Sequence, residues 1–473
     1  MLRNVTLLQT SKDGKATWRL LGPGGMPLES FTAFSDSLLR KSPFNTRATY
    51  CRHLAEFFDY LFEASAQLHA EGPSTSFTRI LLQEIIEAYN DYLVLGPASE
   101  KRVAVLVDRT KPSPQVSPTS AALMHAPVRK FLHLSEHIRR ELEELSDKGL
   151  RTEEVDRQPL LVDLVAKKIV TNRERQRMSA TSMIAGVISG GPKLLKSAAL
   201  PTVSPQVAYH ESRAFPFDLI DGFIQHLPTY RDKTLYAFLA ASGCRMHEAL
   251  QVLLDDIDVN DATVSLRSPL LRANHPSYLA LPSSERDKLA WKGRTTESTL
   301  LIEPFASRFF ENLECYLRYE HIPHGLHQFA FQYMDEKHAG QPYFLSAATS
   351  RNETFKKAVV ASGIQKHISG AHSLRHAYGT YLLNYFPRPN GEYGLPVPLV
   401  QQMMGHASVG STLKYARHDK DLMKLELQHA NAMVFSGAAP KPLLELKLEV
   451  LHAQLTKIQR ELDSQTREGS PHD

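Results

Sequence analysis

Residues 239–258, LAASGCRMHEALQVLLDDID, decide the fold of the C-terminal half of this sequence. Leu235 and Leu239 lie one helical turn apart, and Gly243 can end that helix because glycine adopts a left-handed cap without strain. Such a cap places Arg245 at the turn into the next helix, where a polar side chain is exposed. The stretch therefore predicts a polar site built at helix ends.

Three later segments also carry arginine, lysine or histidine side chains. They are Trp291-Lys292-Gly293-Arg294, His372-Ser373-Leu374-Arg375 and Met404-Gly405-His406. In the second, the histidine and the arginine are three residues apart and share one face of a helix. Around the third, Pro398 suits the first turn of a helix and Gly405 suits its end. Ser411 can cap a further helix that carries Tyr415.

The segments contain arginines, a lysine, histidines and a tyrosine, which are residue types that can bind and cleave a phosphodiester. An arginine guanidinium holds two non-bridging phosphate oxygens at once and stays charged, because its pKa is above about 12. Arg245 and Arg375 could therefore stabilise the negative charge added in a pentacoordinate phosphorane. The paired carboxylates that hold catalytic Mg²⁺ do not accompany these segments, so we expect no metal and no other cofactor.

In order and spacing, the segments resemble the motifs of the tyrosine recombinase, or phage integrase, family. Leu239–Asp258 resembles its first arginine motif, Ala371–Leu383 its His-x-x-Arg motif, and Leu399–His418 its motif of a Gly-His pair and a nucleophilic tyrosine. Thr46–Leu61 weakly resembles the family's helical core-binding domain. The resemblance implies a mainly α fold with a small β-sheet: an all-α, core-binding-like N-terminal domain and an α+β catalytic domain.

The resemblance also implies a role for each matched residue. Tyr415 would attack the scissile phosphate and leave a 3′-phosphotyrosine and a free 5′-hydroxyl. Arg245 and Arg375 would stabilise the transition state, and His372 would act as acid or base beside the nucleophile. His406 would donate a hydrogen bond to a phosphate oxygen. Because the covalent bond stores the phosphodiester energy, religation would need neither ATP nor metal.

The lysine that acts as general acid for the leaving 5′-oxygen has a less direct counterpart in this sequence than the other family residues. The family uses a lysine of a β-hairpin, which corresponds to Lys292 here. An insertion, Arg267–Leu289, precedes this lysine, so Lys288 stays as the alternative.

Each of these residues alone also has a structural interpretation. Tyr378 and Tyr381 fit the apolar side of their helix as packing residues. Glu248 and Asp256 fit as structural partners of the nearby arginine. The order of four separate segments favours the functional interpretation of the set as a whole.

The chain divides into five expected regions. They are a strand-rich lead-in (1–27), a helical core-binding domain (28–145), a basic linker with a helical insert (146–210), the catalytic domain (211–435) and a C-terminal heptad helix with a tail (436–473). The core-binding domain has three expected helices, with a loop at Thr110–Thr119 between the last two. The catalytic domain has an expected hairpin, Val259 to Leu266, turning at Asn260-Asp261, and a strand at Thr299–Ile302.

Two further segments have two open interpretations each. The linker carries Lys167, Lys168, Arg173, Arg175 and Arg177, which would bind a DNA backbone or form a solvated face. The tail carries a heptad pattern at Leu444, Leu448, Leu451, Leu455, Ile458 and Leu462. This helix would pair with another protomer or pack on its own domain.

The composition is typical of a globular protein and argues against a membrane protein or a disulfide-rich protein. The 473 residues are 42% apolar and 22% charged, as in globular proteins, and the net charge is +4. The sequence has neither an apolar run of membrane-spanning length nor a secretory signal, and its three cysteines form no disulfide framework. We therefore expect a cytoplasmic protein.

The sequence predicts a site-specific DNA recombinase, either an integrase or a transposon-encoded enzyme. It would bind double-stranded DNA and work as a homotetramer in a synaptic complex. One alternative is a type IB topoisomerase-like enzyme, which uses similar chemistry as a monomer. The other is a DNA-binding accessory protein that has lost cleavage.

Overall fold

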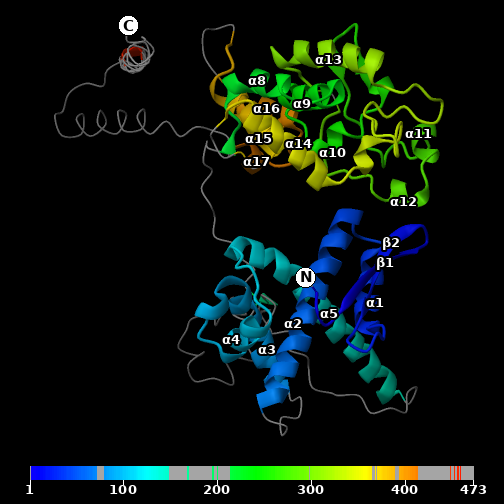
Figure 1. Cartoon of the computed structure of the whole chain (residues 1–473), viewed down its shortest axis with the longest axis vertical. Helices are drawn as coiled ribbons and strands as arrows, with labels where there is room; N and C mark the ends of the chain where they lie inside the picture. The colour runs from blue at the N-terminus through cyan, green and yellow to red at the C-terminus, as the bar shows by residue number, and fades with distance from the viewer. Residues whose placement is uncertain are drawn as a thin grey trace, which may run out of the picture.

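The computed structural model describes residues 2–71, 79–148, 168–169, 194–195, 200, 213–297, 299–364, 368, 370–388, 394–413, 448, 452, 455–456 and 459. These residues are mainly helical, with three two-stranded antiparallel sheets among them. The predicted fold class is confirmed. Figure 1 shows two units, one of blue to cyan elements and one of green to orange elements. Among the described helices, none is both long enough and apolar enough to cross a bilayer.

The lead-in forms a β-hairpin of β1 (Thr6–Lys12) and β2 (Lys15–Leu21). Asp13 and Gly14 join the strands with φ angles of 53° and 73°, which suit the twist of a two-residue hairpin turn. Trp18 and Leu20 are buried and belong to the same hydrophobic core as the helices that follow. The hairpin is therefore part of the N-terminal unit.

Five helices complete this unit: α1 (Glu29–Leu38), α2 (Phe44–Glu71), α3 (Arg79–Val94), α4 (Arg102–Thr110) and α5 (Pro118–Asp147), with the 3-10 turn η1 (Gly96–Ala98). The sequence predicted three of them, and α1 and α4 are additional. Both are short, and short helices depend on packing more than on intrinsic propensity. Val103, Ala104 and Val107 of α4 are buried, and α4 packs on α2 and α3.

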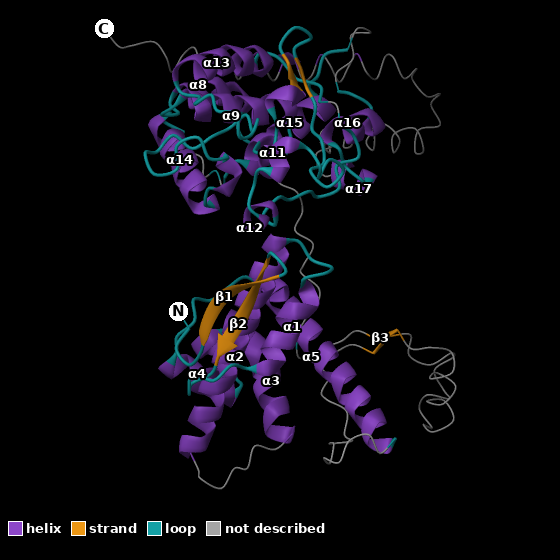
Figure 2. Ribbon diagram, turned by 90° about the vertical axis from the view of Figure 1, so that its right-hand side faces the viewer, coloured by secondary structure: helices purple, strands orange, loops and turns teal. Residues whose placement is uncertain are grey.

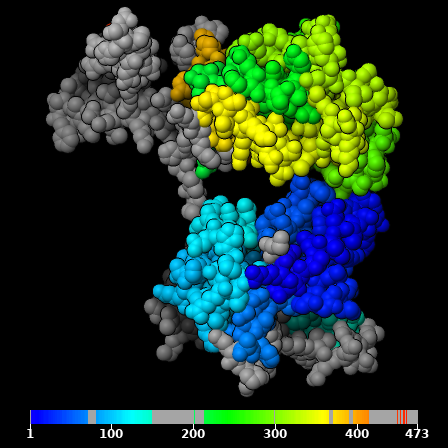
Figure 3. Space-filling model, viewed as in Figure 1, coloured from blue at the N-terminus to red at the C-terminus, as the bar shows by residue number. Residues whose placement is uncertain are grey.

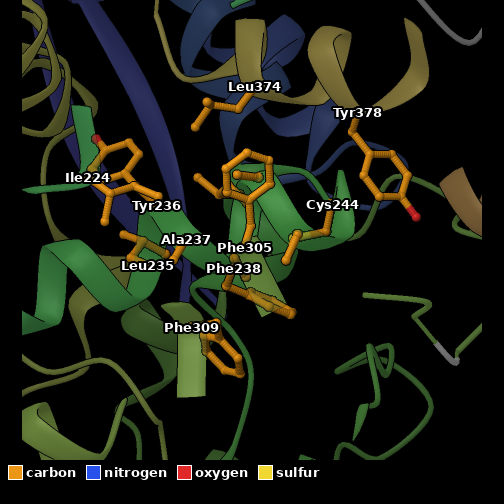
Figure 4. Close-up of a cluster of buried hydrophobic side chains, with 14 of the residues drawn as sticks. Ile224, Leu235, Tyr236, Ala237, Phe238, Cys244, Phe305, Phe309, Leu374 and Tyr378 are labelled. Atoms are coloured by element: carbon orange, nitrogen blue, oxygen red, sulfur yellow. The ribbon is translucent and has the colours of Figure 1, made fainter. Parts of the chain in front are cut away.

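Helix α9 (Tyr230–Ser242) is the centre of the C-terminal unit. All of its residues except Tyr230 and Lys233 are buried. It packs against α13 (Phe305–Tyr319) and α15 (His372–Asn384). Figure 4 shows this core, in which the ring of Phe238 lies 5.0 Å from that of Phe309. Gly243 ends α9 with φ 58°, as predicted, and so fixes the position of the next residues.

This unit contains further elements, which pack on α9 or on its neighbours. They are η3 (Phe217–Leu219), α8 (Ile220–Gln225), α10 (Met246–Ala249), η4 (Leu254–Asp256), η5 (Tyr343–Leu345), α14 (Ala348–Ala361), α16 (Val397–Met404) and α17 (Val409–Leu413). Pro398 lies in the first turn of α16, and Gly405 ends α16 with φ 63°, both as predicted.

The predicted hairpin exists, but its strands are shorter than expected. They are β5 (Ile257–Asp258) and β6 (Thr263–Val264). Val259 lies in the turn and is exposed, so its assignment to a strand was wrong. Thr299–Ile302 contains no strand among its described residues. The Thr299 N–H donates to the carbonyl of Val264 in β6 at 3.3 Å, and the Ile302 N–H donates to the carbonyl of Ala241 in α9 at 2.9 Å, so the segment bridges β6 and α9 without forming a strand.

The insertion Arg267–Leu289 folds into two short helices, α11 (Pro276–Leu279) and α12 (Ser283–Arg286). Tyr278 and Leu281 form a small separate core with Leu253 and Phe329. Arg272 binds both carboxylate oxygens of Asp256, at 2.8 and 2.5 Å. The insertion is therefore held by its own contacts to the C-terminal unit.

Asp287, just after α12, joins the insertion to the N-terminal unit. Its carboxylate accepts from the Ala16 N–H at 3.0 Å and pairs with the guanidinium of Arg47. The side chains of Arg47 and Asp287 are only 2% and 7% exposed. Figure 2 shows α12 next to the hairpin, and Figure 3 shows a hollow between the two units, next to the place where blue and green atoms meet.

Little of the linker and of the tail is described. In the linker, β3 (Lys168–Ile169) pairs with β4 (Leu194–Leu195), and the predicted helical insert lies outside the described residues. In the tail, Leu448 and Leu455 are helical and exposed. The remaining positions of the heptad pattern lie outside the described residues.

Candidate active site

Arg245 lies at the N-cap of α10, as the sequence predicted. Its backbone N–H donates to one carboxylate oxygen of Glu248 at 2.8 Å, and its Nη1 donates to the other at 2.7 Å. The Glu248 side chain is wholly buried, whereas that of Arg245 is 24% exposed. The carboxylate therefore orients a guanidinium that still reaches the surface.

Glu248 is ionised in this position. Burial raises the pKa of its carboxyl, but the hydrogen bond from the Arg245 backbone and the charges of Arg245 and Arg294 outweigh burial and hold the pKa below its usual value. The predicted partnership of Glu248 with the arginine is therefore present. Asp256, the other predicted partner, instead binds Arg272 and Arg267. That prediction was wrong because the insertion supplies its own arginines.

Arg375, in the first turn of α15, is almost wholly buried. It donates to the carbonyl of Gly243, to the carbonyl of Met404 at 2.9 Å and to Nε2 of His406 at 2.7 Å. These partners are the cap of α9, the end of α16 and the Gly-His pair. Arg375 thus brings three of the predicted segments together.

His406 has contacts to both ring nitrogens. Because a guanidinium only donates, Nε2 accepts from Arg375, and the proton is on Nδ1, 2.9 Å from Oγ1 of Thr412. Burial, and then the charges of Arg375 and other arginines, lowers the pKa of His406 to about 4. The ring is therefore neutral at pH 7. The predicted donation to a phosphate would require the other tautomer.

His372 begins α15 and lines a cavity of about 660 Å³. Phe44 and Asn45 of α2 line the same cavity, so it lies where the two units meet. Burial lowers the pKa of His372, and the charges of nearby cations, Arg375 first, lower it further. This histidine is therefore neutral at pH 7 and lies near Arg375 and Arg245.

Both candidate lysines lie near His372. Lys292 is exposed, and its charge contributes to the lowered pKa of His372 and of His247. Lys288 lines the cavity beside His372. The alternative between these two lysines therefore stays open.

Several predicted residues lie outside the described residues: Tyr415, Lys167, Arg173, Arg175 and Arg177. Lys168 lies in β3, opposite Leu195. Ser411 lies inside α17, which begins at Val409, so its prediction as a cap was wrong.

Tyr378 is a packing residue, as expected. Its hydroxyl donates to the carbonyl of Leu300 at 2.9 Å, and its ring occupies the space that a Cβ at position 243 would need. Tyr381 is half-buried and stacks on Phe217.

Arg294 is the residue whose position the sequence did not predict. It belongs to the segment Trp291–Arg294, but its side chain is wholly buried and donates to the carbonyls of Met403 and Met404. The turn Lys292-Gly293-Arg294 contains no local signal for this, because these two partners lie more than a hundred residues away in sequence.

Comparison with known proteins gives one family match, which lies within the C-terminal unit, and several relatives that align over longer parts of the chain. The model of the phage integrase family matches residues 216–421. "Tyrosine recombinase XerD" of Mycobacterium tuberculosis is 26% identical over 221 residues, which are 45% of this chain and 53% of the relative. The XerD of Chlorobaculum tepidum is 25% identical over 291 residues, 61% of this chain and 78% of the relative. The chain thus spans about half the length of the first of these relatives.

Among solved structures, XerA recombinase is 16% identical and covers 85% of this chain and 98% of its own, with a TM-score of 0.31. A Tn1549 transposon integrase in complex with circular intermediate DNA is 13% identical and covers 78% and 98%, with a TM-score of 0.33.

Proposed function

Because residues 216–421 belong to the phage integrase family, we propose that the chain is a site-specific DNA recombinase, which cleaves and rejoins DNA through a 3′-phosphotyrosine. One observation carries this proposal. Arg245, Arg375, His372 and His406, which are far apart in sequence, lie around one site at the ends of α9, α15 and α16.

The proposed reaction forms a bond between the Tyr415 oxygen and phosphorus and breaks the bond from phosphorus to the 5′-oxygen. His372, which its lowered pKa keeps unprotonated at pH 7, would accept the tyrosine proton. Lys292 would give a proton to the leaving 5′-oxygen. Arg245 and Arg375 would oppose the charge that grows on the phosphoryl oxygens.

The proposed substrate is double-stranded DNA, which we place in the hollow between the two units. The cavity lined by Phe44, Asn45 and His372 would then border the scissile strand. The basic residues Lys167, Lys168, Arg173, Arg175 and Arg177 would add contacts to the backbone. We further propose a tetrameric synaptic complex, action in the cytoplasm, and a mobile element as the source of the DNA sites.

The test is covalent capture. The protein is incubated with nicked suicide duplexes taken from the DNA that flanks its own coding sequence, and adducts are separated on a denaturing gel. We expect an adduct with the wild-type chain, none with Tyr415→Phe, and a normal amount with the matched control Tyr381→Phe. An adduct formed by Tyr415→Phe would contradict the proposal. Adduct formation with relaxation of supercoils, but without strand exchange, would favour the topoisomerase-like alternative.

A further inference from the structure

Arg294 is a buried cation next to an exposed loop. Its side chain is wholly buried, although Lys292, two residues earlier, is exposed. Gly293 lies between them with φ +66°, a left-handed conformation that turns the chain. Burying a guanidinium is unfavourable unless polar partners replace the lost water, so its contacts indicate what it does.

Two of its three hydrogen-bond partners are backbone carbonyls at the end of α16. Nη2 donates to Met403 at 2.8 Å and Nη1 to Met404 at 3.4 Å, while Nε donates to Thr296 at 2.8 Å. The last carbonyls of a helix carry partial negative charge and lack helical partners. Arg294 thus caps the C-terminus of α16 with its planar guanidinium.

Gly405 makes this approach possible. It has φ +63°, and a Cβ at this position would overlap the side chain of Arg294. Glycine is therefore required at position 405 for two reasons: it adopts the left-handed backbone conformation, and it leaves room for the Arg294 side chain.

Arg294 also contacts the first arginine segment. Its Nη1 lies 3.7 Å from Oε2 of Glu248, the carboxylate that orients Arg245. The same Met404 carbonyl that accepts from Arg294 also accepts from Arg375. The Arg294 side chain therefore connects the loop that carries Lys292 (residues 291–296, the lysine loop) to residues that contact Arg245 and Arg375.

The loop is held before Lys292 by Ala290, which exchanges hydrogen bonds with Gln251 at 2.9 and 3.1 Å, and after Lys292 by contacts to α16. Arg375 also holds the end of α16, through the Met404 carbonyl. The loop is anchored on α16 by Arg294 and by Thr296, whose Oγ1 donates to the carbonyl of Gln402 at 2.7 Å. Loss of Arg294 should therefore displace the loop more than the helix.

We propose that Arg294 is a positioning residue, which holds the Lys292 loop on the end of α16 so that the lysine can protonate the leaving 5′-oxygen. The inference rests on the proposed function. It goes beyond that function because it assigns the placement of the acid to a residue that does not touch DNA.

The test separates proton donation from the rest of the reaction. In a second suicide duplex, sulfur replaces the bridging 5′-oxygen at the scissile position. The bond between the Tyr415 oxygen and phosphorus forms as in ordinary DNA. The bond that breaks is now the phosphorus–sulfur bond, and the thiolate leaves without a proton. A defect confined to the general acid disappears with this duplex, whereas a general loss of structure affects both duplexes equally.

The variants are Arg294→Lys and Thr296→Val, with Lys292→Ala as the benchmark. Arg308→Lys is the matched control, because Arg308 lies in α13 and forms a partly exposed pair with Asp221. We expect Arg294→Lys to slow cleavage of ordinary DNA about 10²-fold, as a displacement of about 1 Å does, and Thr296→Val to slow it less. With the sulfur duplex, both should approach the wild-type rate, as Lys292→Ala should.

The outcomes separate the inference from the proposed function. Rescue of Lys292→Ala by sulfur, with Arg294→Lys and Thr296→Val slowed equally on both duplexes, would overturn the inference alone. Absence of any wild-type adduct would overturn the proposed function and the inference with it. If Arg294→Lys does not fold, the sulfur rescue of Thr296→Val decides the matter.

Discussion

Arg294 and Arg47 are both buried arginines that lie beside a buried carboxylate. Arg294 connects segments of one unit, whereas Arg47 connects the two units. Arg294 contacts Glu248 and the end of α16 within one hydrophobic core. Arg47 contacts Asp287 across two units that have separate cores. It also donates to the carbonyl of Ser42 at 2.7 Å, inside its own unit.

The comparison shows that a similar ion pair has different consequences in the two places. Removal of the carboxylate beside Arg294 should therefore lower the stability of one unit and disturb its site. Removal of the carboxylate beside Arg47 leaves that arginine with the carbonyls of Ala16 and Ser42, so it should chiefly weaken the coupling of the two units. The chain contains two tryptophans, and Trp18 and Trp291 lie one in each unit, so fluorescence can follow each unit separately.

The largest effect is expected for Glu248→Ala. This change leaves Arg294 buried without its carboxylate and releases Arg245. We expect a loss of about 3–5 kcal/mol in the free energy of unfolding of the C-terminal unit, the usual result of breaking a buried pair. Urea titration of Trp18→Phe variants, which report through Trp291, measures it. The exposed Glu311→Ala is the control, and an equal loss in both would contradict the assigned role of Glu248.

The next effect compares two left-handed glycines. Gly405→Ala and Gly293→Ala should each lose about 1–2 kcal/mol of stability from the left-handed backbone. Gly405→Ala should lose about 1–3 kcal/mol more, because the new methyl group overlaps Arg294, whereas nothing lies within 4 Å of the Cβ position at Gly293. Urea unfolding of both variants gives this difference directly. Equal losses would mean that Arg294 moves aside without cost.

A smaller effect is expected for Asp287→Ala. We expect a loss of about 1–3 kcal/mol, since the Ala16 N–H and the Arg47 guanidinium lose a buried acceptor. The midpoints of unfolding of the two units, read from Trp18 and Trp291 in single-tryptophan variants, should move apart. Asp221→Ala, on the surface of the C-terminal unit, serves as the control. Unchanged spacing of the midpoints would show that the contact does not couple the units.

The smallest effect is a pH dependence of the C-terminal unit. The pKa values of His247, His327 and His406 are lowered to about 4, in each case mainly by burial. An unfolded histidine titrates near 6.5, so below that pH the unfolded state binds more protons than the folded state. The stabilisation is therefore complete above about 6.5 and is lost as the pH falls toward 4.

His327→Gln tests this dependence away from the active site. The free energy of unfolding reported by Trp291 should fall less steeply between pH 7 and pH 4 in this variant than in wild type. His137→Gln on the exposed face of α5 should leave the slope unchanged. A steeper slope in His327→Gln would contradict the assigned direction of the pKa shift.

Local signals predicted the parts of the site that depend on neighbouring residues. The caps at Gly243 and Gly405, the position of Arg245 and the first turn of α16 follow from residues within a few positions of each. The partners of Arg294, Asp256 and Arg47 do not, because they lie in segments that only the folded chain brings together. Tyr415 as the nucleophile and Lys292 as the acid stay predictions.

The contact between Gly243 and Tyr378 has a consequence for how such sequences diverge. The ring of Tyr378 fills the space that a side chain at position 243 would take, while its hydroxyl holds the segment after Lys292 through Leu300. A side chain at 243 would meet both this ring and the left-handed backbone, with φ 58°, so a smaller residue at 378 would relieve only part of the strain. In a set of homologous sequences, position 243 should therefore stay glycine even where position 378 varies.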